Sequence, residues 1–212
     1  MLQFEKFIKK YYPDFNSILK RYGSVQIRNV GTIAGNIATA SPIGDTLPLL
    51  LSLDAKIILD GPKNRELMSL NKFFISYRKT RLKKGQFIYS VKIPIYKKNI
   101  FKAYKISKRF DDDISSVCGS FNIEIYKNRI KKIKIAYGGM SEIPKRAKNT
   151  EKILINSSFS EKVLNNAVKN LERDYKPIDD MRASKSYRME IAKNLLMKCF
   201  LEVRNKKELR LN

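Results

Sequence analysis

The chain has 212 residues, with 44 Lys and Arg against 20 Asp and Glu and a formal net charge of +24. A hydrophobic fraction of 43% beside 30% charged residues excludes wholesale disorder and predicts one core or two small ones. No apolar run approaches the roughly 18 to 20 residues of a membrane-spanning helix. Two cysteines and no histidine exclude an ordinary zinc site, a four-thiolate iron-sulfur cluster and a histidine base within these residues.

The positive charge allows two interpretations. Lysine and arginine are scattered through every segment, which favours a solvated surface and no nucleic-acid partner. The alternative is a basic nucleic-acid-binding module, which would concentrate its cations on one element among aromatic residues. The N-terminus lacks the layout of a secretory signal and cysteines are scarce, so we expect a cytoplasmic protein without membrane association.

The first half of the chain mixes helices and short strands. Residues 1–22 predict a helix interrupted at Pro13, and residues 23–44 predict a loop of small residues whose one charged residue is Arg28. Asp45 is expected to cap a short helix over residues 47–53. Strands are predicted at residues 55–59 and 87–94, with an aromatic-rich connection at residues 70–81.

The second half places strands before helices. Residues 121–126 and 130–137 alternate apolar and polar residues around a turn at 127–128, which predicts an antiparallel pair. Ser160 is expected to cap a helix over residues 163–171, and either Ser184 or Ser186 opens the last helix. This order predicts an α+β fold with one domain at residues 1–98 and a second at 99–206.

The small-residue stretch carries the clearest chemical signal. Residues 25–45 offer backbone N–H groups unshielded by large side chains, the amide of Asn36 and the carboxylate of Asp45. Successive backbone amides of this kind can cradle an anion, and a nearby acid can accept hydrogen bonds from sugar-like hydroxyls. Tight packing is the alternative explanation for so many small residues.

The same stretch resembles a known family. Residues 26–37 and 41–45 resemble the second half of the FAD-binding domain of xanthine dehydrogenases, whose fold is shared with vanillyl-alcohol oxidase and cytokinin dehydrogenase. The resemblance continues through residues 76–80, 101–109, 111–115, 136–140, 180–184 and 187–188, and it covers roughly residues 20–204. It implies a partial FAD-binding domain of the vanillyl-alcohol-oxidase type, followed by an α+β domain like the C-terminal domain of carbon monoxide dehydrogenase flavoproteins.

The resemblance also implies the residues that contact FAD. These positions are Tyr22, Thr32, Ile33, Ala34, Gly35, Asn36, Asp45, Ile88 and Lys105. Tyr22 would stack on the flavin ring, although Tyr22 and Ile88 could equally be core residues and Lys105 a solvated lysine. The acid run 111–113 would lie beside the flavin, or would be a local counterweight to the positive charge. No catalytic acid or base is expected in this chain.

By the same resemblance, the chain holds the flavin of a xanthine dehydrogenase-type molybdenum hydroxylase that oxidises hypoxanthine or xanthine. Electrons would pass from a molybdenum cofactor on a large partner subunit through iron-sulfur clusters to FAD and then to NAD. The family's glycine-rich pyrophosphate loop and its cluster cysteines find no match here. We therefore expect the C-terminal part of such a subunit, partnered by a separate N-terminal segment, with a truncated or inactive fragment as the alternative.

Overall fold

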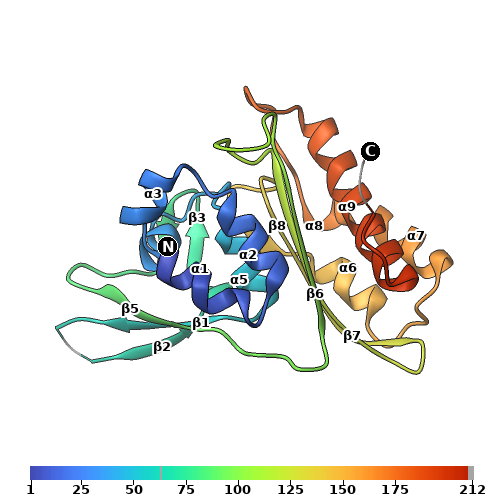
Figure 1. The fold of residues 1–212 in the computed structure, drawn as a ribbon, viewed down its shortest axis with the longest axis horizontal. Helices are drawn as coiled ribbons and strands as arrows, with labels where there is room; N and C mark the ends of the chain where they lie inside the picture. The colour runs from blue at the N-terminus through green and yellow to red at the C-terminus, as the bar shows by residue number, and fades with distance from the viewer. Residues whose placement is uncertain (63, 210–212) are drawn as a thin grey trace.

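The computed structural model describes residues 1–62 and 64–209. A four-stranded antiparallel sheet runs through the middle of the molecule in the order β6-β7-β8-β9. Helices from the first half of the chain cover one face of this sheet, and helices from the second half cover the other (Figure 1). A three-stranded sheet, ordered β2-β1-β5, lies beside the N-terminal helices.

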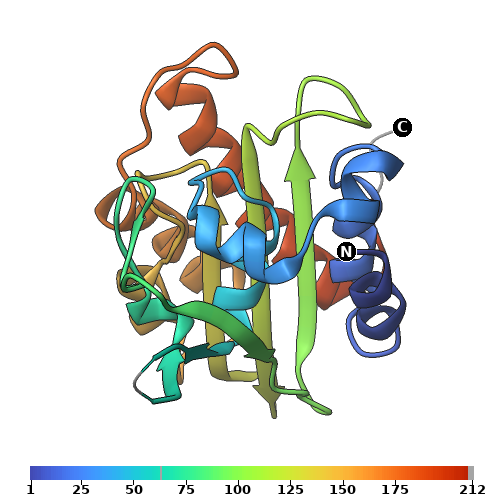
Figure 2. The ribbon, with the colours of Figure 1, turned by 90° about the vertical axis from the view of Figure 1, so that its left-hand side faces the viewer.

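The chain begins with the interrupted helix that its sequence predicts. Helices α1 (Leu2–Lys9) and α2 (Pro13–Lys20) are separated at Pro13, which occupies the first turn of α2 where its missing N–H costs nothing. The α2 helix packs on β6, with the rings of Tyr12 and Phe101 5.0 Å apart. Figure 2 shows these helices beside the edge of the large sheet.

The prediction of a loop at residues 23–44 is wrong. It folds into two short helices, α3 (Val25–Val30) and α4 (Ile33–Thr39). Hydroxyl caps make this possible: Ser24 accepts a hydrogen bond from the backbone N–H of Ile27, and Thr32 accepts one from that of Gly35 at 2.8 Å. Side-chain capping satisfies N–H groups that a short helix otherwise leaves unpaired.

Helix α5 (Thr46–Ser52) forms close to its predicted position, and all seven of its residues are buried. The expectation that Asp45 caps it is wrong. Asp45 occupies the N-cap position but makes no capping hydrogen bond, because its carboxylate binds Lys105 and Ser115. An ammonium partner favours the carboxylate more strongly than a backbone N–H does.

The small sheet confirms both predicted strands and adds others. β1 (Lys56–Asp60) pairs with β5 (Phe87–Lys92) and with β2 (Glu66–Ser69). The aromatic-rich connection contains a 3-10 turn, η1 (Leu70–Lys72), and a hairpin of β3 (Phe74–Ser76) and β4 (Lys79–Thr80).

The large sheet confirms the predicted hairpin and extends it. β7 (Val117–Tyr126) pairs with β8 (Arg129–Gly138) around a turn whose two residues both have positive φ, and it pairs with β6 (Ile100–Ile106) on its other side. β9 (Lys145–Arg146) completes the sheet.

Strand β7 is buried on both of its faces. Cys118, Ser120 and Asn122 face α5, where the hydroxyls of Ser52 and Ser120 lie 2.7 Å apart. Val117, Phe121 and Ile123 belong to the second core, beneath the C-terminal helices. Because successive side chains alternate between faces, one strand joins the two hydrophobic cores.

The second half, as far as residue 209, continues with the helices α6 (Lys148–Leu154), α7 (Glu161–Lys169), α8 (Leu171–Asp174) and α9 (Lys185–Asn205). Ser184, and not Ser186, is the N-cap of α9 and accepts a hydrogen bond from the N–H of Tyr187 at 3.2 Å. Ser160 holds the N-cap position of α7 but makes no side-chain capping bond.

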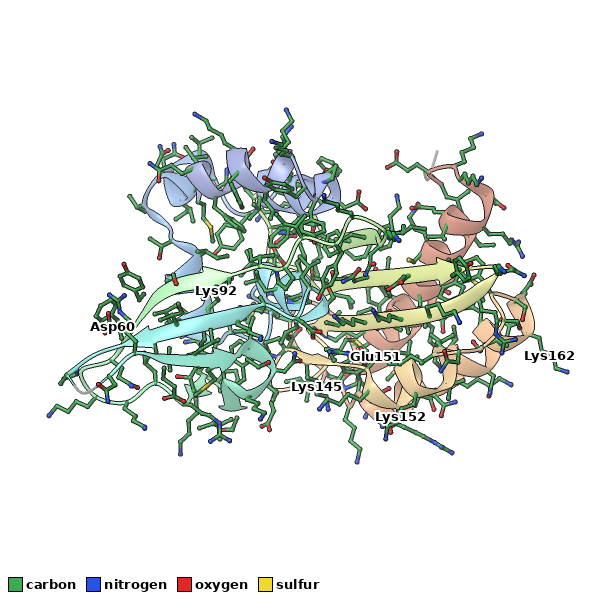
Figure 3. All side chains as sticks on the ribbon, turned by 90° about the horizontal axis from the view of Figure 1, so that it is seen from below. Asp60, Lys92, Lys145, Glu151, Lys152 and Lys162 are labelled. Carbon is green, nitrogen blue, oxygen red and sulfur yellow. The ribbon has the colours of Figure 1, made fainter. Side chains whose placement is uncertain are left out.

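Basic side chains spread over the surface of both halves. In Figure 3, Lys92, Lys145, Lys152 and Lys162 project from four different elements, namely β5, β9, α6 and α7. Among the described residues, no helix combines the length and apolarity needed to cross a membrane.

Candidate functional site

A pocket opens where the helices of the first half meet the loop between β6 and β7. It encloses about 280 Å³. Four of the predicted cofactor positions line it, although they lie far apart in the sequence: Tyr22, Asn36, Asp45 and Lys105. The remaining lining residues are Gly23, Ile27, Ser41, Ile43, Gly44, Asp112, Asp113 and Ile114. The fold thus brings a tyrosine ring, an amide, an ion pair and apolar side chains to one cavity.

The ion pair of Asp45 and Lys105 forms the buried side of this pocket. The Lys105 Nζ lies 2.7 Å from the Asp45 Oδ2, and both side chains are almost fully buried. Lys105 also donates to the backbone carbonyl of Arg21 at 2.9 Å, and Ser115 donates to the second carboxylate oxygen of Asp45. An ammonium has three N–H donors, and these bonds to Asp45 and Arg21 account for two of those of Lys105.

Tyr22 and Asn36 form the second polar group of the pocket. The Asn36 Nδ2 donates to the Tyr22 hydroxyl at 2.9 Å, and the Thr46 hydroxyl donates to the Asn36 Oδ1. Burial raises the pKa of Tyr22, and the negative charge of Asp45 raises it further. The phenol therefore stays neutral at physiological pH, and its ring offers an uncharged flat surface to the pocket.

The predicted positions 32–35 lie next to the pocket and do not line it. They form the cap and first turn of α4, and Asn36 at the end of that turn reaches the cavity. Thr32 and Gly35 are exposed, while Ile33 and Ala34 are half-buried. Thr32 already accepts from the N–H groups of Gly35 and Asn36, through its hydroxyl and its carbonyl, so the donors that this turn leaves beside the pocket are the N–H groups of Ile33 and Ala34.

Ile88 lies elsewhere. It sits on β5 opposite Leu59, is buried in the first hydrophobic core and does not line the pocket. This placement matches the alternative of a core residue, and a cofactor contact at Ile88 stays a prediction.

The acid run contributes two residues to the rim. Asp112 and Asp113 line the pocket and Asp111 does not, although Asp111 and Asp112 are both exposed. The backbone N–H groups of Arg109 and Ile114 donate to Asp113 at 2.8 and 2.9 Å, and these bonds lower the pKa of its carboxyl. These two carboxylates therefore place negative charge at the pocket that Lys105 also lines, and their position beside a flavin stays a prediction.

Sequence reasoning missed two residues that organise the site. Ser115 binds Asp45 across 70 positions, and Arg21 ties α2 to the loop after β6. The Arg21 guanidinium donates to the carbonyls of Phe110 and Lys105 and to the Ser107 hydroxyl, and it lies 4.4 Å from the Phe110 ring centre. Ser115 lies in the stretch 111–115 that resembles the family, but the local sequence around Ser115 and Arg21 does not show their partners, which come from distant elements.

The residues present fit part of a flavin dinucleotide. Tyr22 offers a stacking surface, Asn36 and Lys105 offer donors, and Ile27, Ile43 and Ile114 offer apolar contact. The volume of about 280 Å³ matches one portion of such a ligand and not the whole. Among the described residues, no group of three or more Cys, Asp or Glu is placed to hold a metal ion.

Comparison with known families agrees with this arrangement. Residues 1–96 match the family described as "FAD binding domain in molybdopterin dehydrogenase", and residues 102–203 match "CO dehydrogenase flavoprotein C-terminal domain". The expected resemblance over residues 20–204 is confirmed, and its start is corrected, since the match includes α1 and α2.

Relatives named as enzymes align with most of the length of this sequence. The glyceraldehyde dehydrogenase medium chain of Sulfolobus acidocaldarius is 31% identical over 92% of this chain and 69% of its own. The xanthine dehydrogenase of Dictyostelium discoideum is 38% identical over 74% of this chain. The chain spans 13% of that much longer enzyme.

Solved structures share the fold. The carbon monoxide dehydrogenase of Hydrogenophaga pseudoflava matches with a TM-score of 0.84 at 21% identity, over 89% of this chain and 66% of that chain. Quinoline 2-oxidoreductase of Pseudomonas putida 86 matches with a TM-score of 0.83 at 20% identity, over 96% of this chain and 70% of that chain. The expected fold class is confirmed: an FAD-binding domain precedes a carbon monoxide dehydrogenase flavoprotein C-terminal domain. The chain belongs to the flavoprotein family of the molybdenum hydroxylases.

Proposed function

We propose that this chain binds FAD and passes electrons from iron-sulfur clusters to NAD in a xanthine dehydrogenase-type molybdenum hydroxylase that oxidises hypoxanthine or xanthine. The convergence of Tyr22, Asn36, Asp45 and Lys105 on one pocket carries the proposal, because these residues come from four separate parts of the chain. The flavin, when bound, supplies the electron and hydride chemistry. The chain's own residues bind it, orient it and limit the access of water.

Each pocket residue has a part in this proposal. Tyr22 stacks on the flavin ring, Lys105 donates its remaining N–H to the ligand, and Asn36 donates or accepts at the ribityl hydroxyls. The first turn of α4, with Thr32, Ile33, Ala34 and Gly35, faces the phosphate end of the cofactor. Asp112 and Asp113 place negative charge at the rim, which disfavours a negatively charged flavin and affects how the nicotinamide acceptor approaches.

The rest of the electron path requires partners. We place the molybdenum cofactor on a large subunit, and the iron-sulfur clusters and the pyrophosphate-binding lobe on an N-terminal segment. The name "medium chain" of the Sulfolobus relative supports a multi-subunit assembly. Both cysteines of this chain are free and buried, which favours a reducing cytoplasm over a disulfide-forming compartment.

The proposal of a purine substrate rests on the sequence identity to relatives. Xanthine dehydrogenases from Dictyostelium discoideum and Gallus gallus are 38% and 36% identical in the aligned region, against 31% for the glyceraldehyde dehydrogenase chain. We also propose that the domains divide near residue 98. This position lies between the end of β5 at Lys92 and the start of β6 at Ile100.

Co-expression of the chain with its N-terminal segment and large subunit tests the proposal. The purified complex is expected to be yellow, with one flavin per chain by absorbance. Tyr22→Ala is expected to weaken FAD binding roughly tenfold, whereas Tyr22→Phe retains it because the ring remains. Tyr77→Ala, which removes an exposed tyrosine outside this pocket, serves as the control.

Three outcomes separate the parts of the proposal. A colourless complex with intact partners contradicts FAD binding by this chain. A yellow complex that oxidises aldehydes and not purines keeps the flavin role and contradicts the xanthine dehydrogenase assignment. A yellow complex that reduces oxygen and not NAD contradicts the proposed acceptor alone.

A further inference from the structure

A second polar pocket lies on the C-terminal half, between the loop after β6 and the loop that precedes α9. It encloses about 340 Å³. Its polar lining comes from Ser107, Lys108, Ser116, Arg182, Ser184 and Tyr187. None of these residues lines the candidate pocket of Tyr22 and Lys105 described above. No residue that lines the second pocket carries a carboxylate. The lining therefore offers two cations and several hydroxyls to a ligand.

Two cations from different loops converge on this pocket. Lys108 donates to the carbonyl of Met181 at 2.9 Å, which ties the two loops together and leaves two of its N–H donors free. The guanidinium of Arg182 makes no hydrogen bond or ion pair with any residue in the ranges 1–62 and 64–209. By contrast, the buried Arg188 nearby is fully engaged with Asp180, Ser116 and Gly139.

Ser116 is a further polar residue of this pocket. The residue is only 3% exposed, and its backbone is satisfied by Ile106 and Arg188. Ser116 belongs to the pocket lining, and its hydroxyl makes no hydrogen bond within the described part of the chain. Its hydroxyl is therefore available to donate to a ligand held in the pocket.

The N-terminal end of α9 lies at this pocket. This helix has 21 residues, and its N-cap Ser184 lines the pocket. The positive end of a helix dipole favours an anion, and here the Asp179 carboxylate already accepts from the first N–H of the helix while Ser184 accepts from the N–H of Tyr187. The two acids of the preceding loop are already engaged beside it: Asp180 accepts from Arg188 at 2.6 Å and from the backbone N–H groups of Arg182 and Ala183, and Asp179 accepts from the backbone N–H of Lys185, the first residue of α9, at 2.7 Å. The charges of Arg182 and Lys108 are therefore the features that favour an anion in this pocket.

We propose that this pocket binds a phosphoryl group, carried either by free inorganic phosphate or by a nucleotide. The planar fork of Arg182 suits two phosphate oxygens, Lys108 adds a second positive charge, and Ser116 donates from the depth of the pocket. Tyr187 at the rim gives a nucleotide base an aromatic surface. The proposal does not depend on FAD binding.

Calorimetric titration of the full chain at fixed ionic strength tests it, with inorganic phosphate in one arm and adenosine 5′-monophosphate in the other. Saturable binding at one site is expected. Arg182→Gln and Ser116→Ala are each expected to weaken binding about tenfold, because each removes a direct donor to the phosphate. If the chain binds adenosine 5′-monophosphate more tightly than inorganic phosphate, a nucleotide carries the phosphoryl group. If the two affinities are equal, the ligand is free phosphate.

A matched charge control guards against general attraction to a chain of net charge +24. Lys185→Gln removes one positive charge at the start of α9, outside the pocket lining. It is expected to change the affinity by less than about twofold. The proposal is overturned if the wild-type chain shows no saturable binding, or if Lys185→Gln weakens binding as much as Arg182→Gln does. Thermal melting of Ser116→Ala and of Arg182→Gln checks that each remains folded.

Discussion

Asp45 and Lys105 form a buried ion pair of 2.7 Å between residues that are 60 positions apart. Asp45 lies at the start of α5 and Lys105 near the end of β6, so the pair joins the two halves of the molecule. The backbone carbonyl of Arg21 and the hydroxyl of Ser115 satisfy the pair further. Its charges thus contribute to the fold as well as to the candidate site.

Removing one partner of this pair should destabilise the fold strongly. Lys105→Met leaves the Asp45 carboxylate buried without its cation, and Asp45→Asn leaves the ammonium without its anion. We expect each change to lower the free energy of unfolding by about 3 to 5 kcal/mol. Urea denaturation of the single and double variants measures this. The double variant should lose less than the sum of the two, and strict additivity would show that the residues do not interact.

Gly139 should tolerate no side chain. Its φ is +80°, and a Cβ there would lie 2.3 Å from the carbonyl oxygen of Ser116 and 2.9 Å from the Arg188 Nη1. We expect Gly139→Ala to destabilise the chain by about 1 to 3 kcal/mol through backbone strain, and to displace Arg188 as well. Chemical denaturation measures the loss, with Ser141→Ala as the nearby control. Equal stability of the two variants would argue against the close approach.

Asp180 should make stability depend on acid pH. Its partial burial works to raise its pKa, but hydrogen bonds from the N–H of Arg182, the side chain of Arg188 and the N–H of Ala183 outweigh burial and lower it. A carboxyl with a lower pKa in the folded state adds stability above its unfolded pKa, near 3.9, and this stability is lost as pH falls through the folded value.

The measurement is the urea midpoint between pH 7 and pH 2. Asp180→Asn should lower the midpoint at pH 7 and flatten its dependence on pH below about 4. Asp111→Asn, at an exposed acid on the other loop, serves as the comparison. An unchanged pH dependence in Asp180→Asn would contradict the assignment.

Both thiols should be inert in the folded chain. Burial raises the pKa of Cys118 well above its ordinary value, and the charge of Asp45 raises it further. Burial also raises the pKa of Cys199, with Glu202 adding to the effect. Since the thiolate is the reactive form, we expect no reaction with a disulfide reagent at pH 8 until denaturant is added, when two thiols per chain should titrate. Rapid labelling of the native chain would contradict this burial.

Long periodic elements of the fold could be predicted from the sequence, and short ones could not. The alternation around residues 127–128 correctly identified the central hairpin, and the spacing of apolar residues identified α7 and α9. Strands β2 and β9 have four and two residues, too few for a periodic signal. Small residues between 23 and 44 indicated a loop because helix propensity is low there, and hydroxyl caps overcame that preference.

The candidate site could be predicted only in part. Motif resemblance selected Tyr22, Asn36, Asp45 and Lys105, and these residues do share a pocket. It also selected Ile88, which lies in the first core and does not line this pocket, so a cofactor contact at Ile88 stays a prediction. Asp45 was expected to cap α5 because it directly precedes that helix. The sequence does not show that Lys105 lies close enough in the fold to bind its carboxylate instead. Ser115 and Arg21 were missed for the same reason, since their partners are also distant in the sequence.

The double burial of β7 has a consequence for how the chain can be divided. Helix α5, from the first half, covers the face that carries Cys118, Ser120 and Asn122, while the C-terminal helices cover the other. A fragment cut near residue 98 would leave one face of this strand open to water. The two halves should therefore melt as a single cooperative unit, and a boundary that separates two sequence families does not mark a place where this molecule can be taken apart.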